Sequence, residues 1–399
     1  NDSMNHDPMM RVKKCLNTLK GRLFPSSLAL AFHCLGVTQN LADIQWNIQS
    51  PLDYQVFQRE SLESGQITIK GTVEGLDAAA SILQFRLGDH PNKDWIDTET
   101  ALKNESIDCN VEVPAGGWHQ VELRIIKGGL SMGEYIIPHV GVGELFIVAG
   151  QSNSANHGEE RQRVLSGMVS AFDGIHWRIA DDPQPGASGK GGSFIPVFGD
   201  AMARYFQVPI GVVACGIGAT SVREWLPAGS RFPNPPTLTG RVELLANGEW
   251  TSKGEAHDML IGRMRSLQAQ RFRAVLWHQG ESDANQRDPA RTLPGKLYRE
   301  YLEKLVLSSR KAISRDVPWF VALVSYHIPG DESSVGIREA QTSLWRDGIV
   351  LKGPDSDAIK GHFRERNGQG VHFSAEGLKE HGLRWFDAVA PWLESVLSQ

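Results

Sequence analysis

The sequence predicts an α/β domain with a parallel sheet, preceded by an all-β sandwich. With 399 residues, the chain is longer than one ordinary domain, so we expect two. Short alternating runs fill residues 42–143, whereas from residue 144 to residue 399 apolar runs alternate with segments of helical periodicity. Residues 1–41 have a different composition and are interpreted as a leader.

The first 41 residues resemble a secretory signal. A basic stretch, "RVKKCLNTLKGR", precedes a short apolar run, "LFPSSLALAFHCLGV". Pro25 and His33 interrupt this run, which is too short to span a membrane. We therefore expect a secreted or periplasmic protein. The alternative is a disordered extension with an amphipathic patch.

Residues 42–143 have the pattern of short strands. The runs "GQITIKGTV", "SILQFRLG", "CNVEVPAGGWHQVELRII" and "GEYIIPHVGVG" lie between turns rich in Gly, Pro and Asn. Because no segment of helical periodicity interrupts them, a β-sandwich of about 100 residues is expected.

Residues 144–399 are predicted to form the α/β domain. Strands are expected at "ELFIVAG", "VPIGVVACGIG", "RAVLWHQG", "PWFVALVSYH" and "GIVLKG". Helices are expected at "FIPVFGDAMARYF", "HDMLIGRMRSLQAQRF", "KLYREYLEKLVLSSRKAI" and "GIREAQTSLWRD", and in the closing segment from Ser374. This alternation predicts a parallel sheet with helices on both faces.

Composition excludes several classes of function. Net charge is −5 and basic residues form no stripe, so no nucleic acid partner is expected. No other segment of the sequence is long and apolar enough to span a membrane. The 13 histidines show no zinc-ligand spacing, so no metal is expected. "GIGATS" lacks the third glycine of a dinucleotide fingerprint, and no cofactor is expected.

Polar residues follow four of the predicted elements where a ligand site is expected. In an open parallel sheet, ligands bind beyond the carboxyl ends of the strands. The four clusters are Gly150-Gln151-Ser152-Asn153, Gly216-Ile217-Gly218-Ala219-Thr220, His278-Gln279-Gly280-Glu281-Ser282-Asp283 and, before the last helix, Val371-His372-Phe373-Ser374. Four such clusters at one edge predict a shared site.

The clusters supply the groups needed for acyl transfer. Ser152 is the candidate nucleophile and His372 the base that takes its proton. The oxyanion donors are the backbone N–H groups of Ser152 and Gly218 and the side-chain amide of Gln279. By itself, Ser152 would more commonly be a helix N-cap. His278 competes as base.

With these residues identified, the chain resembles the SGNH hydrolase superfamily, and more narrowly carbohydrate esterases of the sialate O-acetylesterase type. The resemblance rests on "VAGQSNS", "GIGATSVREW", "VLWHQGESD" and "VHFS" and covers Glu144 to the C-terminus. It implies a flavodoxin-like three-layer α/β/α fold and removal of acetyl groups from O-acetylated sugars without metal or cofactor.

Three positions depart from the superfamily pattern. Gln279 replaces the usual Asn, and Ala219 stands in a block that more often reads Gly-Gly-Thr. The superfamily usually carries Asp three residues before the histidine, but that position is Gln369, which cannot hold a negative charge.

The carboxylate that orients His372 must therefore come from elsewhere or be absent. We predict Glu281, which follows the third strand on the same rim, with Asp283 as the runner-up. More distant options are Asp355, Asp357 and Glu365. The alternative role for Glu281 is structural, in binding the serine loop.

The sequence thus predicts an exported serine esterase that removes acetyl groups from a carbohydrate, as a sialate O-acetylesterase or acetylxylan esterase does. One alternative is a carbohydrate-binding protein in which the esterase site has decayed, favoured by Gln369. The other is an esterase of lipid or aryl esters. The residues predicted to form the site are Ser152, His372, Glu281, Gly218 and Gln279.

Overall fold

The computed structural model describes residues 44–75, 81–92, 94–102, 105–267 and 271–398. Ala42–Gln399 forms one compact unit. The leader predicted over residues 1–41 lies outside the described residues. Among the described helices, none is long and apolar enough to cross a membrane.

The first part of the described chain consists of strands, as the alternating pattern predicts. The strands are β1 (Gln45–Ser50), β2 (Gln55–Gln58), β3 (Ser64–Glu74), β4 (Ser81–Leu87), β5 (Ile96–Ala101), β6 (Ser106–Pro114), β7 (Gly116–Lys127) and β8 (Leu130–Gly150). β1, β3 and β6 form one antiparallel sheet, while β4 pairs with β5 and β7, and β7 pairs with β8. Ile67 and Ile69 of one sheet share a core with Leu83 and Leu123 of the other.

Strand β8 joins these strands to the α/β part without a break. It passes through residue 144, where the sequence predicts a domain boundary. Strand β2 pairs in parallel with the middle of β8, at Val140–Gly143. Glu144, fully buried, forms ion pairs at 2.6 Å with Arg59 and with Arg273. Two cations therefore compensate the buried carboxylate at this junction.

The α/β part is built on a parallel sheet, in agreement with the sequence prediction. Its strand order is β10-β9-β11-β8-β15-β16-β17. All neighbours are parallel except the edge pair β10 and β9. The remaining bounds are β9 (Val169–Phe172), β10 (Trp177–Ile179), β11 (Ile210–Ala214), β15 (Ala274–His278), β16 (Trp319–Leu323) and β17 (Leu351–Asp355).

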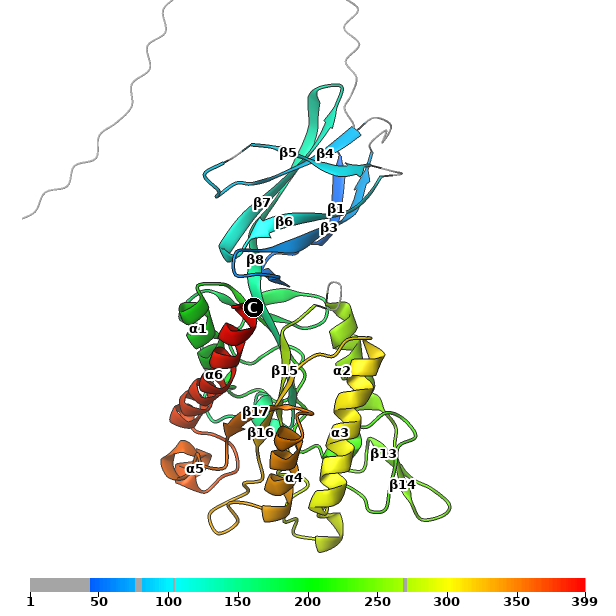
Figure 1. Ribbon diagram of the computed structural model, residues 1–399, viewed down its shortest axis with the longest axis vertical. Helices are drawn as coiled ribbons and strands as arrows, with labels where there is room; N and C mark the ends of the chain where they lie inside the picture. Colours follow the sequence, from blue (N-terminus) through cyan, green and yellow to red (C-terminus); the bar gives the residue numbers. More distant parts are fainter. Residues whose placement is uncertain (1–43, 76–80, 93, 103–104, 268–270, 399) are drawn as a thin grey trace, which may run out of the picture. The chain divides into compact units, whose positions relative to one another are not determined.

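Helices cover both faces of this sheet and give three layers (Figure 1). Phe198 of α1 and Trp385 of α6 pack on one face with Phe146. Leu260 of α2 and Leu302 of α3 pack on the other, together with α4. The helix bounds are α1 (Ile195–Phe206), α2 (Glu255–Ser266), α3 (Gly295–Ala312), α4 (Val335–Arg346), α5 (Glu365–Gly368) and α6 (Ala375–Leu397).

Several short elements were not predicted from the sequence. They are β9, β10, the four-residue α5 and a small antiparallel sheet of β12 (Arg231–Phe232), β13 (Val242–Leu244) and β14 (Trp250–Ser252). Segments of two to four residues are too short to show a period of 2 or 3.6, so no pattern identifies them.

Candidate active site at the carboxyl edge of the parallel sheet

Ser152 lies in a sharp turn at the end of β8. Gly150 has a φ of 128°, and a Cβ there would lie 2.1 Å from the carbonyl oxygen of His278, so only glycine fits. The chain then forms a short 3₁₀ turn, Ser152–Ser154, in which Ser152 is 5% exposed. The end of the strand and the close approach of β15 therefore fix the position of Ser152.

The side chain of Gln151 attaches this turn to the loop after β15. Its Oε1 accepts hydrogen bonds from the backbone nitrogen of Ser282 at 3.0 Å and of Gly280 at 3.4 Å. The backbone nitrogen of Gln151 also donates to the carbonyl of His278 at 2.9 Å. The first and third polar clusters of the sequence are thus held together, as the strand order predicts.

His372 lies before α6 and is paired with a carboxylate. Its Nδ1 is 3.0 Å from Oε1 of Glu365, and the backbone nitrogen of Glu365 donates to the carbonyl of His372 at 2.9 Å. Within the described residues, the other ring nitrogen, Nε2, makes no hydrogen bond. The carboxylate therefore fixes the orientation of the ring, and Nε2 remains available for proton transfer.

A tight turn brings Glu365 back to His372. Arg366, Asn367 and Gly368 all have positive φ, at 53°, 56° and 86°. Gly370 makes room for the carboxylate, because a Cβ there would lie 2.1 Å from Cγ of Glu365. Conformations with positive φ reverse the chain over a few residues.

The serine turn and the histidine loop are hydrogen-bonded to each other. Asn153 Nδ2 donates to the carbonyl of Val371 at 3.2 Å, so the neighbours of Ser152 and His372 are in contact. The backbone nitrogen of Glu159 donates to the carbonyl of Phe373 at 2.9 Å. The first and fourth polar clusters therefore belong to one site.

The prediction that Glu281 is the carboxylate partner of His372 is wrong, because Glu365 occupies that place. Glu281 is 3% exposed and accepts a hydrogen bond from Asn153 Nδ2 at 3.1 Å. Burial raises its pKa to about 7. Its contact with the serine loop agrees with the structural alternative, although the donor is a side chain and not the backbone. Gln369 is exposed and stands outside this pair.

The hydrogen bonds of Gln279 do not support the donor role predicted for it. The fully buried Nε2 donates to Asp283 at 2.7 Å and to the carbonyl of Thr220 at 3.1 Å, and lies 3.3 Å from Gln151 Oε1. An amide nitrogen has two hydrogens, and these acceptors engage both. Asp283, the runner-up for the acid, also accepts from Ser221 Oγ at 2.5 Å. Both side chains hold the second and third clusters together.

Gly218 is the point where the second cluster approaches His157. A Cβ on this residue would lie 2.7 Å from Nε2 of His157, so glycine is required. The backbone nitrogen of Gly218 donates to Oγ of Ser188 at 2.7 Å. The same hydroxyl lies 3.0 Å from His157 Nε2. The backbone donor predicted at Gly218 thus lies close to His157, and it donates its hydrogen bond to Ser188.

Burial keeps both histidines of the site neutral near neutral pH. Burial lowers the pKa of His372 below its ordinary value, and the negative charge of Glu365 partly offsets this effect. The pKa of His157 is lowered by burial and by the positive charge that His372 would carry. The two rings stack with centroids 5.4 Å apart. A neutral imidazole at position 372 is the form that accepts a proton.

The surroundings of three other residues, His278, Ser374 and Trp225, show what each of them does. His278 is 1% exposed and burial lowers its pKa to about 3, which makes it too weak a base. Ser374 caps α6, as its hydroxyl accepts from the backbone nitrogen of Gly377 at 3.2 Å. Trp225 is fully buried and packs edge-on against Trp277.

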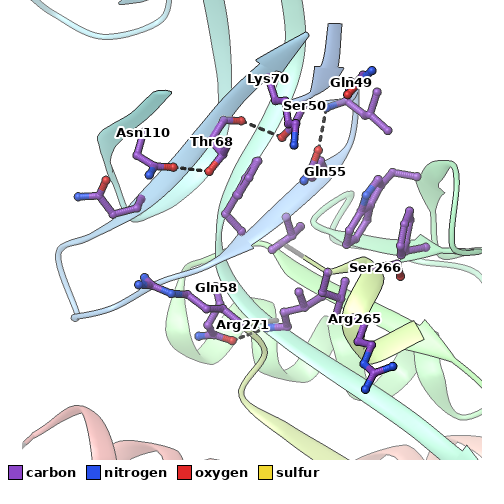
Figure 2. Close-up of a pocket in the computed structure, with 18 of the residues that line it drawn as sticks. Gln49, Ser50, Gln55, Gln58, Thr68, Lys70, Asn110, Arg265, Ser266 and Arg271 are labelled. Carbon is purple, nitrogen blue, oxygen red and sulfur yellow. Dashed lines mark hydrogen bonds between the residues drawn. The ribbon is translucent and has the colours of Figure 1, made fainter. Parts of the chain in front are cut away.

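A cavity of about 810 Å³ lies away from this site (Figure 2). It is lined by Leu145, about 17 Å along β8 from Gly150, and by residues of β1, β3 and β6. Gln55, Thr68 and Asn110 are among its polar lining (Figure 2). Its position at the opposite edge of the sheet separates it from Ser152 and His372. In the described part of the chain, no cluster of His, Cys, Asp and Glu could hold a metal ion.

Sequence reasoning gave little weight to Glu365, named Asn153 in the first polar cluster without a role, and missed Ser188. The signal for Glu365 is the "ERNGQG" segment, in which Asn-Gly and a second glycine mark a tight reversal just before His372. Ser188 lies in "GASGKGGS", which composition identifies only as a flexible loop. No sequence signal links Ser188 to Gly218, because only the packing of two loops places them together.

A three-layer α/β fold with serine, histidine and carboxylate at the carboxyl edge of its sheet is an arrangement that serine hydrolases use. Residues 142–390 match the family described as carbohydrate esterase, sialic acid-specific acetylesterase, and the chain belongs to this family. It is therefore a carboxylic ester hydrolase that acts on acetylated carbohydrates. The resemblance drawn from the four sequence blocks is confirmed.

Solved structures with a similar fold share little sequence with the chain. XAC1771, a carbohydrate acetylesterase from Xanthomonas citri, is 16% identical, with a TM-score of 0.50 over 86% of this chain and 74% of that one. NanS is 13% identical, with a TM-score of 0.44 over 63% and 98%. An Arabidopsis thaliana protein is 18% identical, with a TM-score of 0.43 over 62% and 98%. The chain matches none of the curated proteins.

Proposed function

We propose that the protein removes O-acetyl groups from carbohydrates through a covalent acyl-enzyme on Ser152. In this mechanism His372 is the general base, Glu365 orients it, and the N–H groups of Ser152 and Gly218 bind the oxyanion. The single observation that carries the proposal is the His372–Glu365 pair at 3.0 Å, on a loop that is hydrogen-bonded to the serine turn.

The reaction proceeds in two halves. Ser152 Oγ attacks the acetyl carbonyl carbon, and its proton passes to His372 Nε2. The C–O bond to the sugar then breaks, and the sugar oxygen takes that proton and leaves as an alcohol. Water attacks the acetyl-serine in the same way, with His372 again accepting and returning the proton. Acetate leaves, and Ser152 is regenerated without metal or cofactor.

The proposed substrate is an O-acetylated sialic acid or an acetylated plant polysaccharide such as xylan. The family description, which names sialic acid, supports the first. We also propose that the chain is exported, because its N-terminal stretch resembles a secretory signal. A β-sandwich at residues 42–143 and an esterase domain at residues 144–399 remain the proposed division of the chain.

The test is acetate release from a panel of acetylated glycans by the wild type and by Ser152→Ala. We expect release by the wild type and none by the variant, with unchanged thermal melting. Turnover of longer acyl esters should fall sharply, whereas a lipid esterase would turn them over faster. Glycan binding without acetate release would instead indicate a binding protein with a decayed site.

A further inference from the structure

The N–H group of Gly218 already has a hydrogen-bond acceptor. Its nitrogen is 2.7 Å from Ser188 Oγ, which is a short distance for an N–H···O bond. This N–H is one of the two backbone donors that the proposed mechanism assigns to the oxyanion. Because an N–H group has one hydrogen, it cannot serve the hydroxyl and the substrate oxygen equally well.

The backbone of Ser188 is held firmly in place. Its nitrogen donates to the carbonyl of Gly216 at 2.9 Å, and its carbonyl accepts from the nitrogen of Asn156 at 2.9 Å. The next residue, Gly189, packs so closely that a Cβ would lie 2.2 Å from the carbonyl oxygen of Asn156. Rotation of the side chain about χ1 is therefore the motion by which the hydroxyl leaves Gly218.

His157 supplies a second partner for the hydroxyl. Its Nε2 lies 3.0 Å from Ser188 Oγ, on the side where Gly218 has no Cβ. Burial keeps the pKa of His157 below its ordinary value, which favours the neutral ring. In the tautomer that carries its proton on Nδ1, Nε2 accepts the hydroxyl proton. Ser188 thus bridges the N–H group of Gly218 and Nε2 of His157, whose ring stacks on that of His372.

We propose that the Ser188 hydroxyl holds the place of the substrate carbonyl oxygen and is displaced from Gly218 when substrate binds. Until then it holds the Gly218 N–H in the orientation that the oxyanion requires, without an unsatisfied donor. After displacement, the hydroxyl retains its bond to His157. Ser188 therefore competes with the substrate for the Gly218 N–H group and takes no part in the chemical step. This inference rests on the proposed function, since it takes Gly218 as an oxyanion donor.

The direct test is a crystal structure after reaction with 4-nitrophenyl ethyl methylphosphonate. Ser152 Oγ forms a bond to phosphorus, 4-nitrophenolate leaves, and the phosphoryl oxygen mimics the oxyanion. We expect this oxygen within about 3 Å of the Gly218 nitrogen, and Ser188 Oγ turned away from it. A phosphoryl oxygen bound by the Ser188 hydroxyl, with the Gly218–Ser188 bond intact, would overturn the proposal.

Kinetics of Ser188→Ala give an independent measure. Removing the competing hydroxyl should raise kcat/KM for 4-nitrophenyl acetate by about 2- to 10-fold, which is the effect expected from the net contribution of one ordinary hydrogen bond. A kcat/KM at or below that of the wild type contradicts displacement, and a kcat about 100-fold lower would make the hydroxyl itself an oxyanion donor.

Ser193→Ala is the matched control in the same loop. Its hydroxyl donates to Asp182 at 2.6 Å and has no contact with Gly218 among the described residues. This variant should melt at a lower temperature with unchanged kcat/KM. If Ser152 of the wild type is neither phosphonylated nor active on any acetate ester, the proposed function fails first. That result is distinct from a phosphonylated enzyme in which Ser188 stays in place.

Discussion

Nδ1 of His372 lies 3.0 Å from the carboxylate of Glu365, a residue seven positions earlier in the chain. The superfamily pattern places the acid three positions before the histidine, where this chain has Gln369. The left-handed turn through Arg366, Asn367 and Gly368 shortens the path between the two groups. The carboxylate and imidazole therefore meet despite the substitution at position 369.

Glu365→Gln should lower kcat for an acetate ester by three to four powers of ten. The change preserves shape and removes the charge that stabilises the imidazolium, as the equivalent change does in a serine protease, where the loss is about 10⁴-fold. Steady-state kinetics on purified protein measure this effect. Glu281→Gln is the matched control and should cost less than tenfold, because Asn153 still finds an acceptor. Equal losses in both variants would contradict the assignment.

The pH dependence of kcat/KM should follow His372. The base acts when neutral, so activity rises with pH as the imidazole loses its proton. Because burial holds the pKa of His372 below 6.5, the rising limb should lie below pH 6.5. In Glu365→Gln, loss of the neighbouring negative charge should move the limb to still lower pH. A limb that moves upward would show that Glu365 does not act on this ring.

Glu281→Gln should change how stability depends on pH. Burial raises the pKa of this carboxyl from 4.5 to about 7, so the folded state binds more protons than the unfolded state between those values. The contribution of Glu281 to the free energy of unfolding therefore falls as pH rises from about 4.5 to about 7. The free energy of unfolding of the variant minus that of the wild type, measured by denaturant unfolding, should increase across this pH range and then level off. A constant difference would contradict the raised pKa.

Ala219→Gly should stabilise the protein by about 0.5–1 kcal/mol. Ala219 has a φ of 60°, a left-handed conformation that strains a residue with a Cβ. Glycine removes this strain, but its greater conformational freedom in the unfolded chain cancels part of the gain in stability. Urea unfolding gives the difference. In the control Ala201→Gly, the substitution lies inside α1 and should cost about 1 kcal/mol. If both substitutions changed the free energy of unfolding in the same direction, the conclusion that Ala219 is strained would be contradicted.

The sequence by itself determined the main strands and helices of the α/β part and predicted where the candidate site lies. The runs that become β8, β11 and β15 are apolar over four or more residues, and a polar cluster follows each of them, so the direction of a parallel sheet brings those clusters together. Ser152 was identified for this reason, and His372 was identified from the polar cluster that precedes the last helix. The last helix was also predicted, in the closing segment from Ser374.

Tertiary structure alone decided which side chains touch. Glu281 follows a strand at the correct edge, yet its carboxylate points to Asn153, while Glu365 is carried to His372 by a turn of three residues with positive φ. Gln279 has the expected amide, but Asp283 and Thr220 engage it. A hydrogen bond requires atoms within about 3 Å, whereas strand order fixes positions only to the width of a loop. Loop conformation and packing therefore determined which carboxylate pairs with His372. They also brought the Ser188 hydroxyl within hydrogen-bonding distance of the Gly218 nitrogen.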